Sequence, residues 1–334
     1  MENTLYKKIK RTTNSIKNDL VNDLNYYPKS LMIVRFINNC TFRGKLLKPL
    51  NNWSLEKRHK FIMDYLYKEY KEVFDKYEDE KDFEDESQDL PIWVCWLQGE
   101  DNAPQLVKNC IRSIRKHSNN HKVVLITEKN YKDYINMPEY IVDKYNNKNI
   151  SAAHFSDIIR MMLLRDYGGL WLDATVYCKR DIPEYVFEKS VFSCKSLRQK
   201  TSYISEYQWT SFILGGRKNS LFYRFMVDFY LEYWKREEVA IDYLFMDYVI
   251  LLARKHIKVI DNEIENIPVN NLDRDYLSFI FNNKFEDEEY RKLISSDTYF
   301  YKLSWRENFK DITDDGTSTF YSIFVNKFDK CFDL

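Results

Sequence analysis

Three short apolar runs separated by helical segments constrain the fold of this chain more than any other feature of its sequence. The runs are 91–97 and 122–127, which are continuously apolar as in strands buried on both faces, and 170–177. Helices are expected between them, at 104–117 and at about 152–166. This alternation is typical of a mostly parallel sheet flanked by helices, so we predict an α/β fold.

Charge divides the first ninety residues into a basic and an acidic part. Residues 1–60 carry 13 Lys and Arg against 4 Asp and Glu, and residues 61–90 carry 4 basic against 12 acidic side chains. Such an acidic run is typical of a solvated linker or of a helix end. We therefore place a domain boundary near Asp89, with a helical N-terminal region, 1–88, and a single α/β domain, 89–334.

The N-terminal region is expected to be mainly helical. Apolar side chains recur at helical spacing between residues 61 and 74, and Ser54 can cap that helix. Basic side chains cluster before it, at Lys7, Lys8, Lys10, Arg11 and Lys17. Two interpretations stay open: the cluster contacts an anionic membrane surface or a partner, or it is an ordinary solvated helix face.

Composition excludes several classes of protein. The formal net charge is zero, whereas nucleic-acid-binding proteins usually carry a basic excess, so we expect no nucleic-acid partner. No run of about eighteen apolar residues is present to span a bilayer, and the N-terminus lacks the apolar core of a secretory signal. The six cysteines are scattered without metal-ligand spacing. This favours reduced thiols and a cytoplasmic protein, at most peripheral on the inner face of the cell membrane.

The helix expected around residue 157 contains two charged side chains in apolar surroundings. Its apolar residues occupy almost every face: Phe155, Ile158, Ile159, Met161, Met162, Leu163 and Leu164. Asp157 and Arg160, one turn apart, are therefore largely desolvated, which is costly without partners. Two explanations stay open. The pair is either an internal ion pair that joins the helix to the sheet, or a binding site for sugar hydroxyls and phosphate oxygens.

Glycine is scarce, and four of the seven glycines form two adjacent pairs. Gly168 can take the left-handed conformation that ends the preceding helix, and Gly215-Gly216 is interpreted as a turn that ends a strand. Soon after the first pair, Asp173 lies within a strand of apolar residues, where an unpaired carboxylate is costly. We therefore expect Asp173 to be hydrogen-bonded, metal-bound or at the open end of its strand.

The segment 156–175 contains a motif that resembles a known pattern. It reads Ser156-Asp157-Ile-Ile-Arg160 and then Gly168-Gly169-Leu-Trp-Leu-Asp173-Ala-Thr175. This resembles the pattern S-D-x-x-R … G-G-x-x-x-D-x-D of the retaining sugar transferases of the DXD class, which include yeast-type initiating mannosyltransferases and large glucosylating bacterial toxins. The form G-G-L-W-L-D-A-T is most similar to the bacterial capsular polysaccharide synthesis protein family. Segments 92–104 and 302–305 are also similar to that family, so the resemblance extends from about residue 89 to residue 306.

The resemblance implies a GT-A fold, a nucleotide-binding α/β sandwich that uses a nucleoside diphosphate sugar. It implies that Asp157 and Arg160 hold the donor sugar and that Asp173 contacts ribose, sugar or metal, so these three are the predicted catalytic residues. Trp96 matches the aromatic residue that stacks on the nucleotide base, although a tryptophan in such a run can equally be a core residue. The late segment adds three predicted nucleotide-sugar-binding residues: Lys302, Ser304 and Trp305.

One position departs from the family pattern. The third position of the DXD motif, normally an acid that binds metal directly, is Thr175, and a hydroxyl is a weaker ligand for a hard divalent cation than a carboxylate. The resemblance favours Mn²⁺ or Mg²⁺, held by Asp173, Thr175, the diphosphate and water. The alternative is that a cation such as Lys302 neutralises the leaving diphosphate.

We therefore expect a retaining glycosyltransferase of the hexosyltransferase class. Its donor is expected to be a UDP-sugar and its acceptor a growing, lipid-linked capsular or other surface polysaccharide. No dedicated nucleophile is identifiable, so front-face displacement assisted by the leaving phosphate is the hypothesis. The segment with Asp242 and Asp247 lines an acceptor groove or is an amphipathic helix. Two rival functions are a non-catalytic nucleotide-sugar-binding module, disabled by Thr175, and a toxin-like enzyme that glycosylates a protein, against which the lack of a secretion segment argues.

Overall fold

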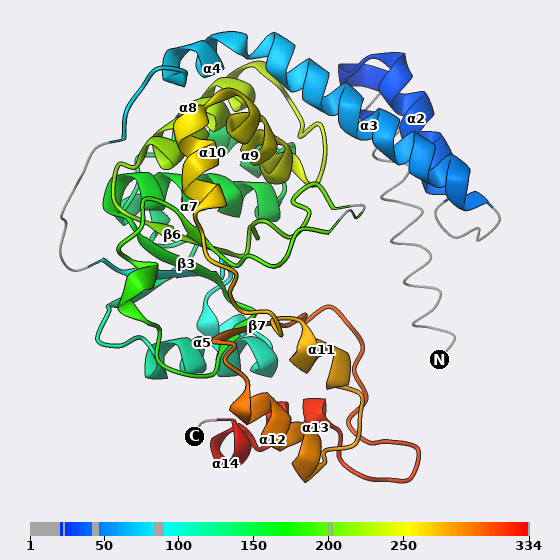
Figure 1. Cartoon of the computed structure of the whole chain (residues 1–334), viewed down its shortest axis with the longest axis vertical. Helices are drawn as coiled ribbons and strands as arrows, with labels where there is room; N and C mark the ends of the chain where they lie inside the picture. Colours follow the sequence, from blue (N-terminus) through cyan, green and yellow to red (C-terminus); the bar gives the residue numbers. More distant parts are fainter. Residues whose placement is uncertain are drawn as a thin grey trace.

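The computed structural model describes residues 21–22, 24–41, 47–82, 90–199, 201 and 203–332. In this part of the chain, helices surround one five-stranded sheet and a smaller two-stranded sheet (Figure 1). The basic cluster at residues 7–17 and the end of the acidic run, 83–89, lie outside the described residues.

The five-stranded sheet has the order β2-β1-β3-β6-β5. Its strands are β1 (Ile92–Cys95), β2 (Val123–Ile126), β3 (Gly169–Asp173), β5 (Phe192–Ser193) and β6 (Ile213–Gly216). β1 pairs parallel with β2 and β3, whereas β6 pairs antiparallel with β3 and β5. The predicted α/β class is confirmed, but the sheet is mixed rather than mostly parallel. The described part of the chain between β3 and β6 contains no α-helix to carry it back across the sheet, so the two strands run in opposite directions.

The parallel half agrees with the sequence-based expectation, except at its third strand. The predicted helices are present as α5 (Gln105–Lys116) and α7 (Ala152–Tyr167), with α6 (Glu139–Asn146) between them. The single strand expected at 170–177 is two strands. β3 ends at Asp173, and β4 (Val176–Cys178) leaves the sheet to pair with β7 (Phe300–Lys302). The remaining helices in chain order are α8 (Leu221–Arg236), α9 (Phe245–His256), α10 (Lys258–Glu265), α11 (Tyr276–Ile280), α12 (Asp287–Ser295), α13 (Phe320–Asn326) and α14 (Phe328–Cys331).

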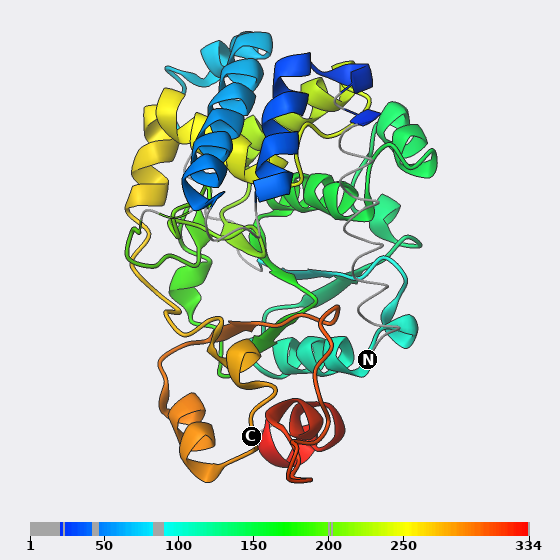
Figure 2. The ribbon, with the colours of Figure 1, turned by 90° about the vertical axis from the view of Figure 1, so that its right-hand side faces the viewer.

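The sheet separates two hydrophobic cores because alternate strand residues point to opposite faces. Trp93 and Trp171 belong to the core that contains α7, α8 and α9. Val94 and Leu172 belong to the core on the other face, which contains α5 and the C-terminal helices. Figure 2 shows the sheet between these two helical layers, and a layer of helices on each face is the arrangement expected for an α/β domain.

The two glycine pairs meet on neighbouring strands, where Gly169 is paired with Gly216. Gly168 and Gly169 have φ angles of 68° and 96°, and a Cβ on Gly169 would lie 2.0 Å from the carbonyl oxygen of Pro91. Only glycine tolerates this combination of backbone conformation and close approach. Gly168 therefore ends α7 as predicted, whereas Gly215 and Gly216 are the last residues of β6 rather than a turn beyond it.

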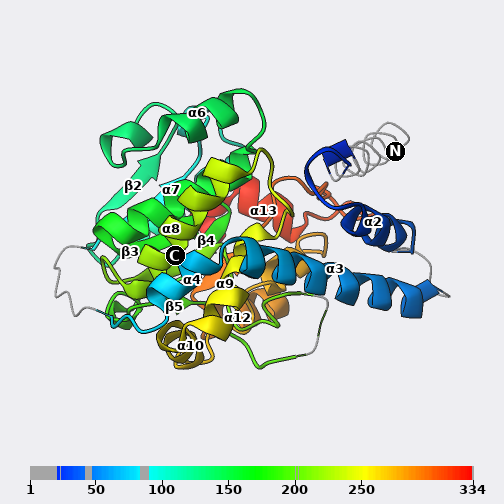
Figure 3. The ribbon, with the colours of Figure 1, turned by 90° about the horizontal axis from the view of Figure 1, so that it is seen from above.

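The N-terminal helices lie over the helical layer that covers the first core (Figures 1 and 3). They are α2 (Lys29–Thr41), α3 (Lys48–Glu69) and α4 (Lys71–Tyr77). α3 packs on α9 and α4 on α8, so Leu66 and Phe74 share a core with Trp93. The predicted helical character is thus confirmed for the described part of this region, whereas the boundary near Asp89 stays a prediction. Among the described helices, none is long and apolar enough to cross a bilayer.

Candidate active site

The residues predicted to bind the donor line one cavity of about 840 Å³. They are Trp96, Asp157, Arg160, Asp173, Thr175, Lys302, Ser304 and Trp305. They meet because β1 and β3 are adjacent parallel strands whose carboxyl ends, Cys95 and Asp173, are register partners. The first half of α7 and the end of β7 also line this part of the cavity. Ligands bind at this edge of open α/β sheets, so the cavity is the candidate active site.

Arg160 joins the two predicted carboxylates. Its side chain is 5% exposed, Nη1 lies 3.2 Å from Oδ1 of Asp157, and Nη2 donates to Oδ1 of Asp173 at 3.1 Å. The guanidinium also lies 4.7 Å from the centroid of the Trp171 ring. The internal ion pair left open by the sequence is therefore present, but it does not seal the site. The Asp157 and Asp173 side chains stay 17% and 29% exposed and line the cavity.

The carboxylate of Asp173 is surrounded by hydrogen-bond donors. Its Oδ1 also accepts from Trp171 Nε1 at 3.0 Å, and its Oδ2 accepts from Lys302 Nζ at 2.7 Å. The same ammonium donates to Thr175 Oγ1 at 2.8 Å. Lys302 reaches both groups because β7 pairs with β4 in a register that sets Lys302 opposite Val176, next to Thr175. Of the three alternatives that the sequence left open for Asp173, hydrogen bonding and a position at the end of its strand are both observed.

The pKa values of the carboxylates in the cavity are shifted in different directions. Burial raises the pKa of Asp157 above its usual value, and Arg160 offsets this only in part. Burial acts in the same direction on Asp173, but Lys302 and Arg160 outweigh it and hold its pKa below the usual value. Burial raises the pKa of Asp247, another residue of the cavity wall, to about 6, although Trp209 Nε1 donates to it at 2.8 Å. Environments that separate pKa values in this way are typical of sites that handle charge or protons.

The hydrogen-bond donors around Asp173 and Thr175 occupy the oxygen atoms that a divalent cation would need, so this environment does not suit such a cation. Both oxygens of Asp173 accept hydrogen bonds, and the Thr175 hydroxyl accepts one from an ammonium group. Mn²⁺ and Mg²⁺ need several oxygen ligands, and the described residues contain no cluster of three His, Cys, Asp or Glu side chains that could hold a metal ion. Binding of Mn²⁺ or Mg²⁺ through Asp173 and Thr175 stays a prediction.

Two tryptophans form an aromatic wall. Trp96 lies just beyond β1, not within a strand as expected, and its ring centroid is 5.6 Å from that of Trp305 at an interplanar angle of 77°. Trp96 Nε1 and Arg160 Nε are buried without a hydrogen-bond partner in the part of the chain that the structure describes. Buried donors are normally paired, so these two N–H groups can donate to a polar ligand or to water in the cavity.

The opposite side of the cavity was not identified from the sequence, apart from the segment that contains Asp247. Its residues include Tyr203, Trp209, Tyr243, Asp247 and Phe279. They come from connecting segments, from the start of α9 and from α11, where no motif marks them. The only signal was the pair of acids, Asp242 and Asp247, of which Asp247 lines the cavity.

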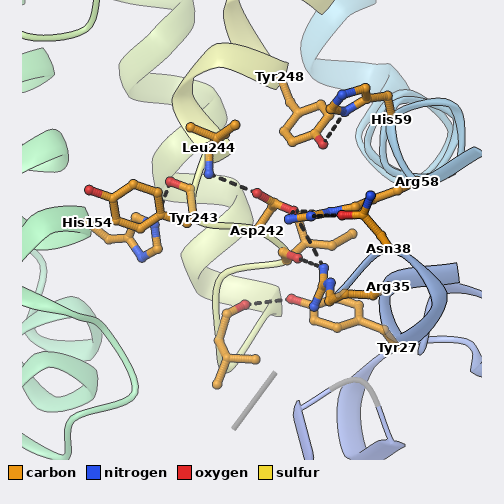
Figure 4. A network of polar contacts seen from close by, with 12 residues as sticks. Tyr27, Arg35, Asn38, Arg58, His59, His154, Asp242, Tyr243, Leu244 and Tyr248 are labelled. Atoms are coloured by element: carbon orange, nitrogen blue, oxygen red, sulfur yellow. Dashed lines mark hydrogen bonds and ion pairs between the residues drawn. The ribbon is translucent and has the colours of Figure 1, made fainter. Parts of the chain in front are cut away.

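The N-terminal helices hold the segment that leads into this side (Figure 4). The Asp242 side chain is fully buried, and its Oδ2 accepts from Nε and Nη2 of Arg58 at 3.0 and 2.5 Å. Arg35 Nη2 lies 3.7 Å from the same oxygen and donates to the carbonyl of Ile241 at 2.6 Å. Tyr243, the next residue, lines the cavity. α2 and α3 therefore contribute to the position of the cavity wall.

Individual proteins that are similar to parts of the chain include a curated relative and two solved structures. A segment of 111 residues is 26% identical to the O-glycosyltransferase braB of Annulohypoxylon truncatum, which corresponds to 30% of this chain and 26% of that protein. The chain thus matches about a quarter of that relative's length. Among solved structures, the PaToxG glycosyltransferase is 14% identical with a TM-score of 0.38, over 64% of this chain and 83% of that one. The WbbM bifunctional glycosyltransferase is 12% identical with a TM-score of 0.39, over 75% of this chain and 51% of that one. Similarities at these TM-scores do not define the fold.

A comparison with the sequence patterns of protein families gives a match over a longer part of the chain. The sequence model described as "Capsular polysaccharide synthesis protein" matches residues 43–323, which include every predicted site residue and all of α3 and α4 in addition to the segment where the motifs lie. Because this match spans well over half of the chain, the chain belongs to the capsular polysaccharide synthesis protein family.

Proposed function

We propose that the protein is a retaining glycosyltransferase with a GT-A-like domain, which transfers a sugar from a UDP-sugar to a growing surface polysaccharide. One observation carries the proposal. The charged group formed by Asp157, Arg160 and Asp173 lies at the carboxyl edge of the parallel strands and lines an open cavity. Membership of the capsular polysaccharide synthesis family and the similarity of one segment to an O-glycosyltransferase support it.

The donor occupies the charged half of the cavity in this proposal. Asp157 accepts from hydroxyls of the donor sugar, and Arg160, held between the two carboxylates, keeps both oriented. Trp96 stacks on the uracil, and Lys302, Ser304 and Trp305 contact the diphosphate side. The lowered pKa of Asp173 keeps it ionised at neutral pH, so it can face positive charge on the sugar.

The reaction breaks the bond between the anomeric carbon and the oxygen of the β-phosphate, whose electron pair leaves with the diphosphate. The acceptor hydroxyl oxygen bonds to the same face of that carbon, and its proton passes to the leaving phosphate. The configuration is thereby retained. Charge of opposite sign at both ends of the breaking bond stabilises the transition state more than the bound substrate, which is what raises the rate. Asp157 or Asp173 faces the sugar, and Lys302 faces the phosphate.

The aromatic mouth of the cavity supports a carbohydrate acceptor. Of the eighteen large apolar side chains that are exposed in the described residues, three line the side of the cavity opposite Trp96 and Trp305: Tyr203, Tyr243 and Phe279. They are 57 to 79% exposed and come from three separate segments of the chain. Exposed aromatic rings stack well on the apolar faces of sugar rings and carry a polar edge for hydroxyls. An acceptor glycan therefore fits this half of the cavity.

The N-terminal helices carry a second group of exposed apolar side chains. Eight of the same eighteen lie between residues 21 and 53. Ile33 and Phe36 share one side of α2, and Leu50 and Trp53 share one side of α3, since each pair is three residues apart. An excess of nine positive charges in residues 1–60, from 13 basic and 4 acidic side chains, favours an anionic surface as their partner. We therefore place the protein at the inner face of the cell membrane, where a lipid-linked acceptor would lie.

Donor turnover tests this function. The purified protein is incubated with UDP-glucose, UDP-galactose or UDP-N-acetylglucosamine, with and without Mn²⁺, and released UDP is measured. We expect turnover of at least one donor, and its loss in Asp157→Ala and Asp173→Ala. Asp64→Ala on α3, where the carboxylate is 65% exposed, is the matched control. UDP binding without turnover of any donor would favour the non-catalytic module. A protein that neither binds UDP nor releases it would refute the donor site.

A further inference from the structure

The strongest unexplained feature of the site is the ammonium group of Lys302. Its Nζ lies 2.7 Å from Oδ2 of Asp173 and 2.8 Å from Oγ1 of Thr175, so one cation joins the first and third positions of the motif. These are the two positions at which a divalent cation would be held. With a neutral hydroxyl at residue 175, the two carboxylates of Asp157 and Asp173 face the two cations of Arg160 and Lys302, and the charge there is already balanced.

Backbone hydrogen bonds fix the position of Lys302 next to the motif. It ends β7, in register with Val176 of β4, and its N–H donates to the carbonyl of Arg274 at 2.7 Å. The N–H of Leu303 donates to the carbonyl of Thr175 at 2.9 Å. These contacts hold the start of the side chain beside Thr175, so the ammonium lies within reach of the motif.

The ammonium group can still act on a ligand. Its side chain is 26% exposed and lines the cavity. An ammonium has three N–H donors, and the contacts with Asp173 and Thr175 use two of them, which leaves one for a phosphate oxygen. Arg274 lines the same cavity, and its buried Nη1 has no hydrogen-bond partner among the described residues. A metal ion would be repelled by Lys302 and by Arg160, whose guanidinium also contacts Asp173.

We propose that Lys302 takes the place of the divalent cation, so that the protein binds a nucleoside diphosphate and transfers the sugar without a metal. The inference rests on the proposed function, because it assigns Lys302 to the diphosphate of that donor. When the bond from the anomeric carbon to the β-phosphate oxygen breaks, its electron pair moves onto the diphosphate. Lys302 balances that negative charge as a fixed ammonium and transfers no proton.

Calorimetric titration with UDP, in EDTA or in Mn²⁺, gives a readout that does not depend on turnover. We expect the affinity of the wild-type protein to agree within about twofold between the two buffers. Lys302→Met should lower it about tenfold or more, as expected for a lost charge-assisted hydrogen bond, and Lys302→Arg should recover part of it. Lys310→Met, which removes an ammonium that is 61% exposed and outside the cavity, should have no effect. Melting temperatures confirm that each variant is folded.

A reciprocal variant makes the test sharper. Lys302→Ala combined with Thr175→Asp removes the ammonium and supplies a second carboxylate, so its UDP affinity should become dependent on Mn²⁺. Wild-type binding or turnover that EDTA abolishes and Mn²⁺ restores would overturn the inference while leaving the glycosyltransferase proposal intact. An unchanged affinity in folded Lys302→Met would also overturn it. Absence of UDP binding in every buffer would overturn both.

Discussion

The buried carboxylate of Asp242 offers a direct test of how the N-terminal helices are joined to the rest of the protein. Asp242→Asn keeps the volume of the side chain and an oxygen that can accept from the N–H of Leu244, as Oδ1 does at 3.0 Å. It removes the negative charge that Arg58 and Arg35 contact. The substitution therefore measures the contribution of the negative charge alone, because the shape of the side chain is kept.

The expected cost follows from burial. Removing one partner of a buried ion pair costs about 3–5 kcal/mol, because the remaining charge stays desolvated. The Arg35 side chain is 5% exposed, but that of Arg58 is 20% exposed and can recover water, so we expect the lower end, about 3 kcal/mol. With the usual unfolding entropy per residue, a chain of 334 residues would melt about 4 °C lower.

Calorimetric or fluorescence melting at neutral pH measures this effect. Asp64→Asn is the matched control on α3, because its ion pair with Lys60 is exposed on both sides and should contribute almost nothing. We also expect faster amide hydrogen exchange in α2 and α3 of Asp242→Asn than in the control. If Asp242→Asn melts within about 1 °C of the wild type, the network does not hold the helices in place and the reasoning is wrong.

Three further predictions concern the cavity and the membrane. Burial raises the pKa of Asp247 to about 6, so its ionisation destabilises the fold progressively as the pH rises from about 4 to 6. Asp247→Asn should therefore melt at a higher temperature than the wild type at pH 7.5, by an amount equivalent to about 2–3 kcal/mol. This difference in stability should shrink towards pH 4, and an equal difference at both pH values would contradict the burial argument. Trp96→Ala should lower the affinity for UDP about tenfold, measured by titration, and leave the melting temperature within a few degrees; unchanged affinity would remove Trp96 from the site. Phe36→Glu should reduce sedimentation with vesicles rich in phosphatidylglycerol, whereas Ile312→Glu, an equally exposed position outside the N-terminal helices, should not; equal binding by both variants would refute the membrane surface.

The parallel half of the fold could be predicted because its signals are local. The apolar runs that became β1 and β2 and the helical periodicity of α7 are each read within a few residues. The sequence also predicted that Asp157 and Asp173 lie close together, because the motif places Asp157 on a helix and Asp173 at the end of the next strand. These two residues line one cavity with the other predicted site residues.

The rest depends on contacts between residues far apart in the chain. No residue near Asp173 indicates that the strand ends there, since Val176 and Tyr177 are as apolar as the residues before it. They belong to a second sheet because they pair with β7, which lies more than a hundred residues later in the chain. The antiparallel pairing of β6 is likewise set by the connection from β3. The bond between Lys302 and Thr175 follows from the register of β4 and β7, which no local pattern encodes. The aromatic mouth combines the three segments that contain Tyr203, Tyr243 and Phe279, and no motif marks any of them as neighbours.

A crystal structure with UDP bound tests the central claim most directly. The account predicts that the uracil lies against Trp96 and that the diphosphate lies within hydrogen-bond distance of Lys302 Nζ, on the same side of the cavity as Asp173. It would be contradicted by UDP bound outside the cavity. It would also be contradicted by an empty cavity, with Asp157, Arg160 and Asp173 still in contact only with protein, at a saturating concentration of UDP.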